Sequence, residues 1–149
     1  MLYLASPHRP QATSLHGWHL SFVGAVCAVF LQLWGLYRVV GPPQPAWFPS
    51  ADKLEHAAGF ALPVMLILLT VALRSSLSWH ELSFRATALV VAVFAAHAVV
   101  SEVIQHMWYR HRLGDPLDVL ADWAGITVGV LVLRLILRSR RLGDGLATP

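Results

Sequence analysis

Residues 49–73 read PSADKLEHAAGFALPVMLILLTVAL. A long apolar run follows four ionisable side chains, those of Asp52, Lys53, Glu55 and His56. Crossing about 30 Å of hydrocarbon takes roughly 20 residues of α-helix, and this run is long enough. The stretch therefore predicts a transmembrane helix whose first turns are charged.

The whole chain has the composition of a membrane protein. Of its 149 residues 56% are hydrophobic and 13% are charged, whereas soluble domains carry about 25% charged residues. Spans of sufficient length cover about Trp18–Val40, Lys53–Leu73, Arg85–Met107 and Pro116–Leu137. Because backbone polar groups in lipid must be satisfied within each segment, we expect an all-α bundle of four transmembrane helices.

These spans leave no room for a separate soluble domain. We expect one transmembrane domain over residues 18–137, a short N-terminal segment over 1–17 and a basic tail over 138–149. The first apolar run exceeds the h-region of a signal peptide, so we interpret it as a helix. Cys27 is the only cysteine, which excludes an intramolecular disulfide and gives no indication of a thiolate metal site.

The basic residues at the span borders predict the orientation. Six Arg residues flank the side that holds both termini, and three Arg residues with Lys53 flank the other. The excess favours cytoplasmic termini in a plasma or inner membrane. The second and fourth helices would then begin, and the third would end, at the outer face.

Acidic residues converge on this outer layer. Six of the chain's eight fall there, namely Asp52, Glu55, Glu102, Asp115, Asp118 and Asp122. A carboxylate buried at such depth costs several kcal/mol unless it is paired. The partners within reach are Lys53, His56, Arg110 and Arg112.

Helical spacing predicts which side chains face the bundle. Asp118, Asp122, Gly125 and Gly129 recur every three or four residues and share one face. Glycines on that face would allow a neighbouring helix to approach closely. We therefore expect the acidic stripe to face another helix. Near the centre of the third span, we expect His97 to point inward and to hydrogen-bond Ser101.

The ordered motifs resemble the VanZ-like membrane protein family. The resemblance rests on Asp52-Lys53-x-x-His56, Glu102-x-x-Gln105, Arg112, and the stripe that begins at Asp118. It implies a small bacterial membrane protein of the cell envelope, and the family's namesake is linked to resistance against teicoplanin-type glycopeptides. Two positions depart from the family pattern. Asp122 stands where the family usually carries Asn, and Ala57 replaces an aromatic residue that often follows the motif His.

The candidate site residues divide into two groups. Acid–base chemistry or cation binding is expected of His56, Glu102, Asp118 and Asp122. Substrate binding is expected of Asp52, Lys53, Gln105 and Arg112. A guanidinium suits phosphate, so we expect an amphiphilic, phosphate-bearing lipid or glycan precursor of the envelope as the ligand. A divalent cation is a candidate cofactor.

Two other interpretations stay open. The charged layer could be a structural ion-pair network in a non-enzymatic scaffold, which would bind partner helices through Gly125 and Gly129. A small transporter would need a polar path across the membrane. Charged side chains are concentrated in the outer third of the spans, with His97 and Gln32 deeper, so this interpretation is disfavoured. Nucleic acid is not an expected partner, because the basic residues line the membrane borders. Whether the protein is an enzyme, and its oligomeric state, are left undecided.

Overall fold

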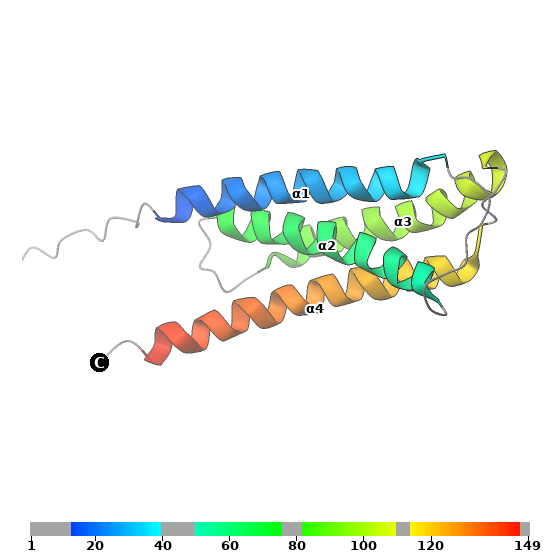
Figure 1. Cartoon of the computed structure of the whole chain (residues 1–149). Coiled ribbons are helices and arrows are strands. Elements are labelled where there is room, and N and C mark those ends of the chain that lie inside the picture. Colours follow the sequence, from blue (N-terminus) through cyan, green and yellow to red (C-terminus); the bar gives the residue numbers. More distant parts are fainter. Residues whose placement is uncertain (1–12, 40–49, 76–81, 110–113, 147–149) are drawn as a thin grey trace, which may run out of the picture.

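The computed structural model describes residues 13–39, 50–75, 82–109 and 114–146. These ranges hold four helices and no strand: α1 (Thr13–Tyr37), α2 (Ala51–Arg74), α3 (Phe84–Trp108) and α4 (Pro116–Leu146). The helices lie side by side in one bundle, and α1 begins at the end where α4 finishes (Figure 1). The all-α, four-helix prediction is confirmed.

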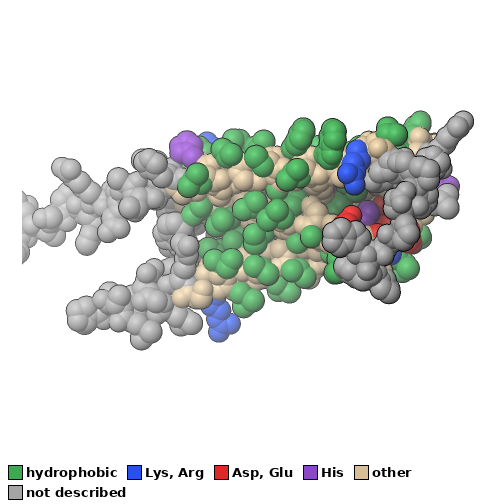
Figure 2. Space-filling view, viewed as in Figure 1, with side chains coloured by type: hydrophobic (Ala, Val, Ile, Leu, Met, Phe, Trp, Pro, Cys, Tyr) green, Lys and Arg blue, Asp and Glu red, His purple; other side chains and the backbone are tan. Residues whose placement is uncertain are grey.

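Each helix is long and apolar enough to cross a membrane. Large apolar side chains point outward all along the bundle (Figure 2), as at Leu20, which is 75% exposed, and at Phe84 and Leu135. Such exposure would be costly in water, but lipid tails are as apolar as these side chains. The chain is a multi-pass membrane protein.

Two helix ends differ from the sequence-based bounds. Helix α1 begins at Thr13, and α4 continues to Leu146, so much of the expected tail is helical. The expected bounds followed the apolar run, which marks only the part that can lie in hydrocarbon. Arg and Leu sustain a helix well beyond that limit, since both are among the better helix formers.

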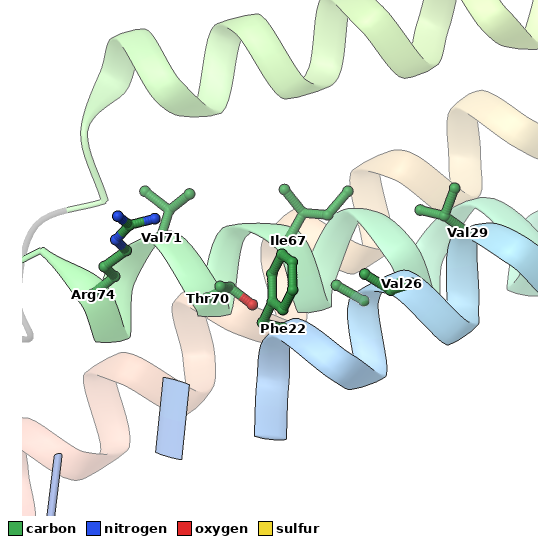
Figure 3. A pocket seen from close by; sticks show the side chains of 8 residues that line it. Phe22, Val26, Val29, Ile67, Thr70, Val71 and Arg74 are labelled. Atoms are coloured by element: carbon green, nitrogen blue, oxygen red, sulfur yellow. The ribbon is translucent and has the colours of Figure 1, made fainter. Parts of the chain in front are cut away.

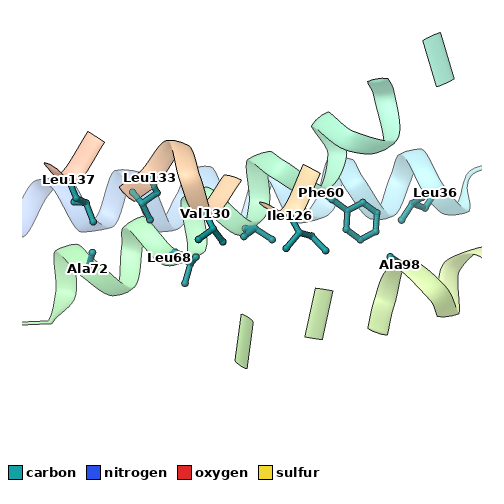
Figure 4. Packing of buried hydrophobic residues seen from close by; sticks show 10 residues of the cluster. Leu36, Phe60, Leu68, Ala72, Ala98, Ile126, Val130, Leu133 and Leu137 are labelled. Atoms are coloured by element: carbon teal, nitrogen blue, oxygen red, sulfur yellow. The ribbon is translucent and has the colours of Figure 1, made fainter. Parts of the chain in front are cut away.

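The core lies mainly between α2 and α4, the two helices that pack most extensively (Figure 4). Buried side chains recur every three or four residues on each helix and so form one stripe per helix. The stripe on α2 is Phe60, Val64, Leu68 and Ala72, and that on α4 is Ile126, Val130, Leu133 and Leu137.

Both stripes continue into charged residues toward the start of each helix. His56 lies one turn before Phe60, and Asp122 lies one turn before Ile126. We call the group to which they belong the charged cluster: Asp52, Lys53, His56, Glu102, Asp115, Asp118 and Asp122. Acidic and histidine side chains gather at that end of the bundle in Figure 2. The cluster thus occupies positions that are apolar core elsewhere along the helices.

Close approach between α2 and α4 confirms the expected role of the two glycines. A Cβ atom on Gly125 would overlap the carbonyl oxygen of Ala57, and one on Gly129 would lie 2.5 Å from that of Ala61. The two backbones are therefore in direct contact beside the charged cluster. The contact lies next to the His56–Asp122 pair, since Ala57 follows His56 and Gly125 lies one turn after Asp122.

Candidate functional site

Lys53, the only lysine of the chain, binds three carboxylates. Its ammonium group lies 2.6 Å from Asp115 Oδ2 and 3.1 Å from Asp52 Oδ2, and it donates to Asp118 Oδ1. An ammonium group has three donors, and each one has an acidic partner here. Lys53 is therefore held within the cluster, with 23% of its side chain exposed.

Asp115 connects the cluster to the start of α4. Its Oδ1 accepts a hydrogen bond from Leu117 N at 2.9 Å, and Pro116, which lacks an N–H, occupies the first helical position. The hydrogen bond from Lys53 lowers the pKa of the Asp115 carboxyl below its usual range. Because this pKa is lower in the folded than in the unfolded state, the Lys53–Asp115 contact stabilises the fold above about pH 4. That stabilisation is lost as the pH falls further.

His56 lies between two carboxylates from successive turns of α4. Its Nδ1 is 3.0 Å from Asp122 Oδ1, and its Nε2 is 3.7 Å from Asp118 Oδ2. Asp122 is fully buried, and among the described residues its Oδ2 has no hydrogen-bond partner. The imidazole therefore satisfies only half of this buried carboxylate.

Glu102 completes the site from α3. Its Oε2 accepts a hydrogen bond from Asp115 N at 2.9 Å, and its Oε1 is buried with no partner in the described part of the chain. A Cβ atom at Gly114 would lie 2.6 Å from the Glu102 carbonyl oxygen, so the chain entering α4 needs glycine to cross α3 here. His56, Glu102 and Asp122 each offer one ligand atom, and these atoms lie within 4.8 Å of one another.

Most of the expected site residues come together in this cluster. Lys53, His56, Glu102, Asp118 and Asp122 form its interior, contributed by three helices. Asp52 contacts Lys53 from the exposed rim. Gln105 is buried, and no described residue accepts a hydrogen bond from its Nε2. Arg112, the expected phosphate ligand, lies outside the described residues, as does Arg110.

Other contacts were not predicted from the sequence. Asp115 was expected in the charged layer but not as a site residue, although an Asp directly before a Pro at a helix start signals a cap. His97 Nε2 lies 3.1 Å from the Tyr37 hydroxyl, so the expected bond to Ser101 was wrong. The Ser101 hydroxyl instead donates to the Ala98 carbonyl, one turn back in its own helix.

An apolar groove between α1 and α2 lies toward the other end of α2 (Figure 3). It is lined by Phe22, Ala25, Val26, Val29, Ile67, Thr70, Val71 and Arg74. The Arg74 guanidinium lies 5.5 Å from the centre of the Trp18 ring, in a cation–π contact. The groove has almost no polar lining, so the charged cluster is the better candidate for a site with chemistry.

Two charge-neutralising substitutions should separate the roles of the acids. We expect Asp118→Asn to lower the free energy of unfolding by about 1–2 kcal/mol, because Lys53 loses a charge-assisted partner. We expect Glu102→Gln to be neutral or stabilising, because it removes a buried, half-satisfied charge. Thermal unfolding in one detergent with a chelator measures both. Equal large losses would mean that Glu102 is as fully paired as Asp118.

Comparisons with protein-family models, with curated proteins and with solved structures find no match to this chain. Function is therefore inferred from the sequence motifs and from the geometry of the charged cluster. That cluster combines an ammonium group, an imidazole and several carboxylates at one end of a membrane bundle. Such a set can bind a polar headgroup, hold a cation or transfer a proton.

Proposed function

We propose that the chain is a VanZ-like integral membrane protein of the bacterial cell envelope, and that its charged cluster binds the headgroup of a phosphate-bearing lipid or glycan precursor. The motif residues Lys53, His56, Glu102 and Asp118 occur in the family's order along the sequence. They belong to one cluster built from three helices. Their proximity supports a common role.

The observation that carries the proposal is the burial of charge that is only partly neutralised. Asp122 and Glu102 keep buried oxygens without a hydrogen-bond partner among the described residues. Ionisable groups within membrane spans are costly, and they generally mark binding or transport sites. A purely structural cluster would be expected to satisfy these oxygens.

The proposed orientation places the cluster at the extracytoplasmic face. Both termini would be cytoplasmic, since Arg residues are more numerous on their side of the spans. A precursor whose polar headgroup lies at that outer face would meet the cluster, and the exposed apolar flanks of the bundle suit a lipid tail. The ligand would therefore lie with its tail along the helices and its headgroup at the cluster.

Lys53 and Arg112 would hold the phosphate. Two carboxylates that contact Lys53, those of Asp52 and Asp115, are the more exposed ones, with 60% and 38% of their side chains accessible. A headgroup arriving from water could take over their hydrogen bonds to the ammonium group. Arg112 would add a bidentate fork, while His56, Glu102 and Asp122 lie deeper as acid–base or cation-binding groups.

Binding of a polyisoprenyl phosphate, compared with the matching polyisoprenol, tests the proposal. We expect the purified protein in nanodiscs to prefer the phosphate, and Arg112→Ala to weaken that binding by about 10–100-fold, the value of one or two charged hydrogen bonds. Arg138→Ala, at the far end of α4, should bind normally. Equal affinity for phosphate and alcohol in the parent protein would contradict the proposal.

The contacts of Lys53 favour a second candidate, a scaffold in which the cluster only fixes helix register. Three carboxylates around one ammonium group resemble a structural network. In that case charge-removing variants would change stability and leave lipid binding at the level of the alcohol control. The nanodisc experiment therefore separates the two candidates.

A further inference from the structure

We infer that His56, Glu102 and Asp122 form a binding site for one divalent transition-metal ion, with Zn²⁺ as the best match. The three side chains come from α2, α3 and α4 and offer ligand atoms within 4.8 Å of one another. These donor atoms alone would form the site, and metal binding there would not require a bound lipid.

Free donor atoms are the first support for the site. Glu102 is 6% exposed and Asp122 is fully buried, yet Oε1 of the first and Oδ2 of the second have no hydrogen-bond partner among the described residues. A buried carboxylate oxygen without a donor loses several kcal/mol of solvation. A metal ion bound between the two carboxylates would supply the positive charge that they lack.

The spacing of the donors suits a single ion. Ligand atoms at about 2.1 Å from an ion lie roughly 3–4 Å from each other. His56 Nδ1 and Asp122 Oδ1 are already 3.0 Å apart, and the full set lies within 4.8 Å. Closing the set around an ion therefore needs side-chain shifts of about 1 Å or less, which rotamer adjustments can provide.

The charge balance points the same way. Among the described residues, the cluster holds five carboxylates against the Lys53 ammonium group and the His56 imidazole. All three donors of Lys53 are used by Asp52, Asp115 and Asp118. Among the described residues, Glu102 and Asp122 thus have only the His56 imidazole between them, and an ion carrying two positive charges would neutralise both carboxylates.

The donor set selects the class of metal. One imidazole nitrogen with two carboxylate oxygens is typical of Zn²⁺ and related transition ions, whereas Mg²⁺ and Ca²⁺ prefer oxygen ligands alone. Three protein ligands would leave a coordination position open, as in catalytic rather than structural zinc sites.

Asp118 would orient the histidine. Its Oδ2 lies 3.7 Å from His56 Nε2, so a small rotation lets Nε2–H donate to Asp118 and turns the Nδ1 lone pair toward Asp122 and Glu102. Metal-binding histidines almost always donate their second ring N–H to a carboxylate or carbonyl in this manner. Asp118 is therefore a positioning residue in this site and not a ligand.

Metal binding by the purified full-length protein in detergent tests the inference. After stripping with a chelator and dialysis, we expect one equivalent of Zn²⁺ to bind in calorimetry and the thermal midpoint to rise with Zn²⁺ concentration. Mg²⁺ at the same concentration should shift the midpoint much less. Asp122→Asn and Glu102→Gln should each weaken Zn²⁺ binding at least tenfold.

Matched variants distinguish a built site from adventitious binding. Glu55→Gln removes an exposed acid from α2, and His106→Gln removes an exposed imidazole from α3; both should bind Zn²⁺ like the parent protein. Because Asp122→Asn and Glu102→Gln remove buried charge, their metal-free thermal midpoints should equal or exceed that of the parent. This readout shows that lost binding is not lost folding.

Three results would overturn the inference. They are no stoichiometric Zn²⁺ in the parent protein, unchanged affinity in Asp122→Asn and Glu102→Gln, and loss of binding in His106→Gln as large as in those variants. The zinc titration is done without lipid ligand. Stoichiometric Zn²⁺ binding without a preference for polyisoprenyl phosphate in nanodiscs would therefore reject only the proposed headgroup function. A phosphate preference without stoichiometric Zn²⁺ binding would reject only the metal site.

Discussion

Replacing Lys53 by Met should lower the free energy of unfolding by about 2–4 kcal/mol, near the lower end of the cost of removing one member of a buried ion pair. Lys53 is the only lysine of the chain, and its ammonium group contacts Asp52, Asp115 and Asp118 together. Met keeps most of the side-chain volume, so the loss reports charge and not packing. Thermal or denaturant unfolding in one detergent, with a chelator present, measures it.

Two comparisons make this expectation specific to the cluster. Arg134→Met removes an exposed cation from α4 and should leave stability unchanged or slightly higher. The double variant Lys53→Met/Asp118→Asn should lose less than the sum of the two single variants, because the second change removes a charge that the first left unpaired. Additive losses in that cycle would mean that Lys53 and Asp118 do not stabilise each other.

The fold could be predicted from the sequence because the bilayer constrains it strongly. Apolar runs of sufficient length can only be helices, and the spacing of Gly125 and Gly129 after Asp122 identified the face of α4 that meets another helix. The ends of α1 and α4 were placed less accurately. Hydropathy marks the membrane portion of a helix, and a helix can continue into water without an apolar signal.

The sequence predicted which residues form the candidate site better than it predicted which of them pair with one another. Alternating helix direction brings Lys53, His56, Glu102 and Asp118 to one end of the bundle, and this follows from the spans alone. Which carboxylate meets which cation depends on the rotation of each helix about its axis and on the short chain entering α4. For that reason Asp115 was not named as a partner of Lys53, and Tyr37 was not named as a partner of His97.

Gly125→Ala should be the most damaging small substitution in the bundle. Its Cβ atom would overlap the carbonyl oxygen and Cα of Ala57, and backbone atoms cannot rotate away as a side chain can. Overpacking of a close-packed interior costs about 1–3 kcal/mol and more where backbones must separate. Alanine regains at most about 1 kcal/mol of helix propensity, so we expect a net loss of about 2–3 kcal/mol in detergent unfolding.

Gly59→Ala is the matched control, because a Cβ atom there meets nothing within 4 Å. It should be neutral or slightly stabilising through helix propensity. Ala57→Gly should fail to rescue Gly125→Ala, since the obstructing atoms belong to the backbone of residue 57. A rescue by that change would place the clash on the side chain and contradict the close backbone contact.

The same substitution connects the packing to the site. Ala57 follows His56 directly, and Gly125 lies one turn after Asp122, so any separation of α2 from α4 at this contact also separates the imidazole from its carboxylate. If the metal site exists as inferred, Gly125→Ala should weaken Zn²⁺ binding even where the variant remains folded, and Gly59→Ala should not. Unchanged Zn²⁺ affinity in a folded Gly125→Ala protein would show that the glycine contact stabilises the bundle without positioning His56 and Asp122.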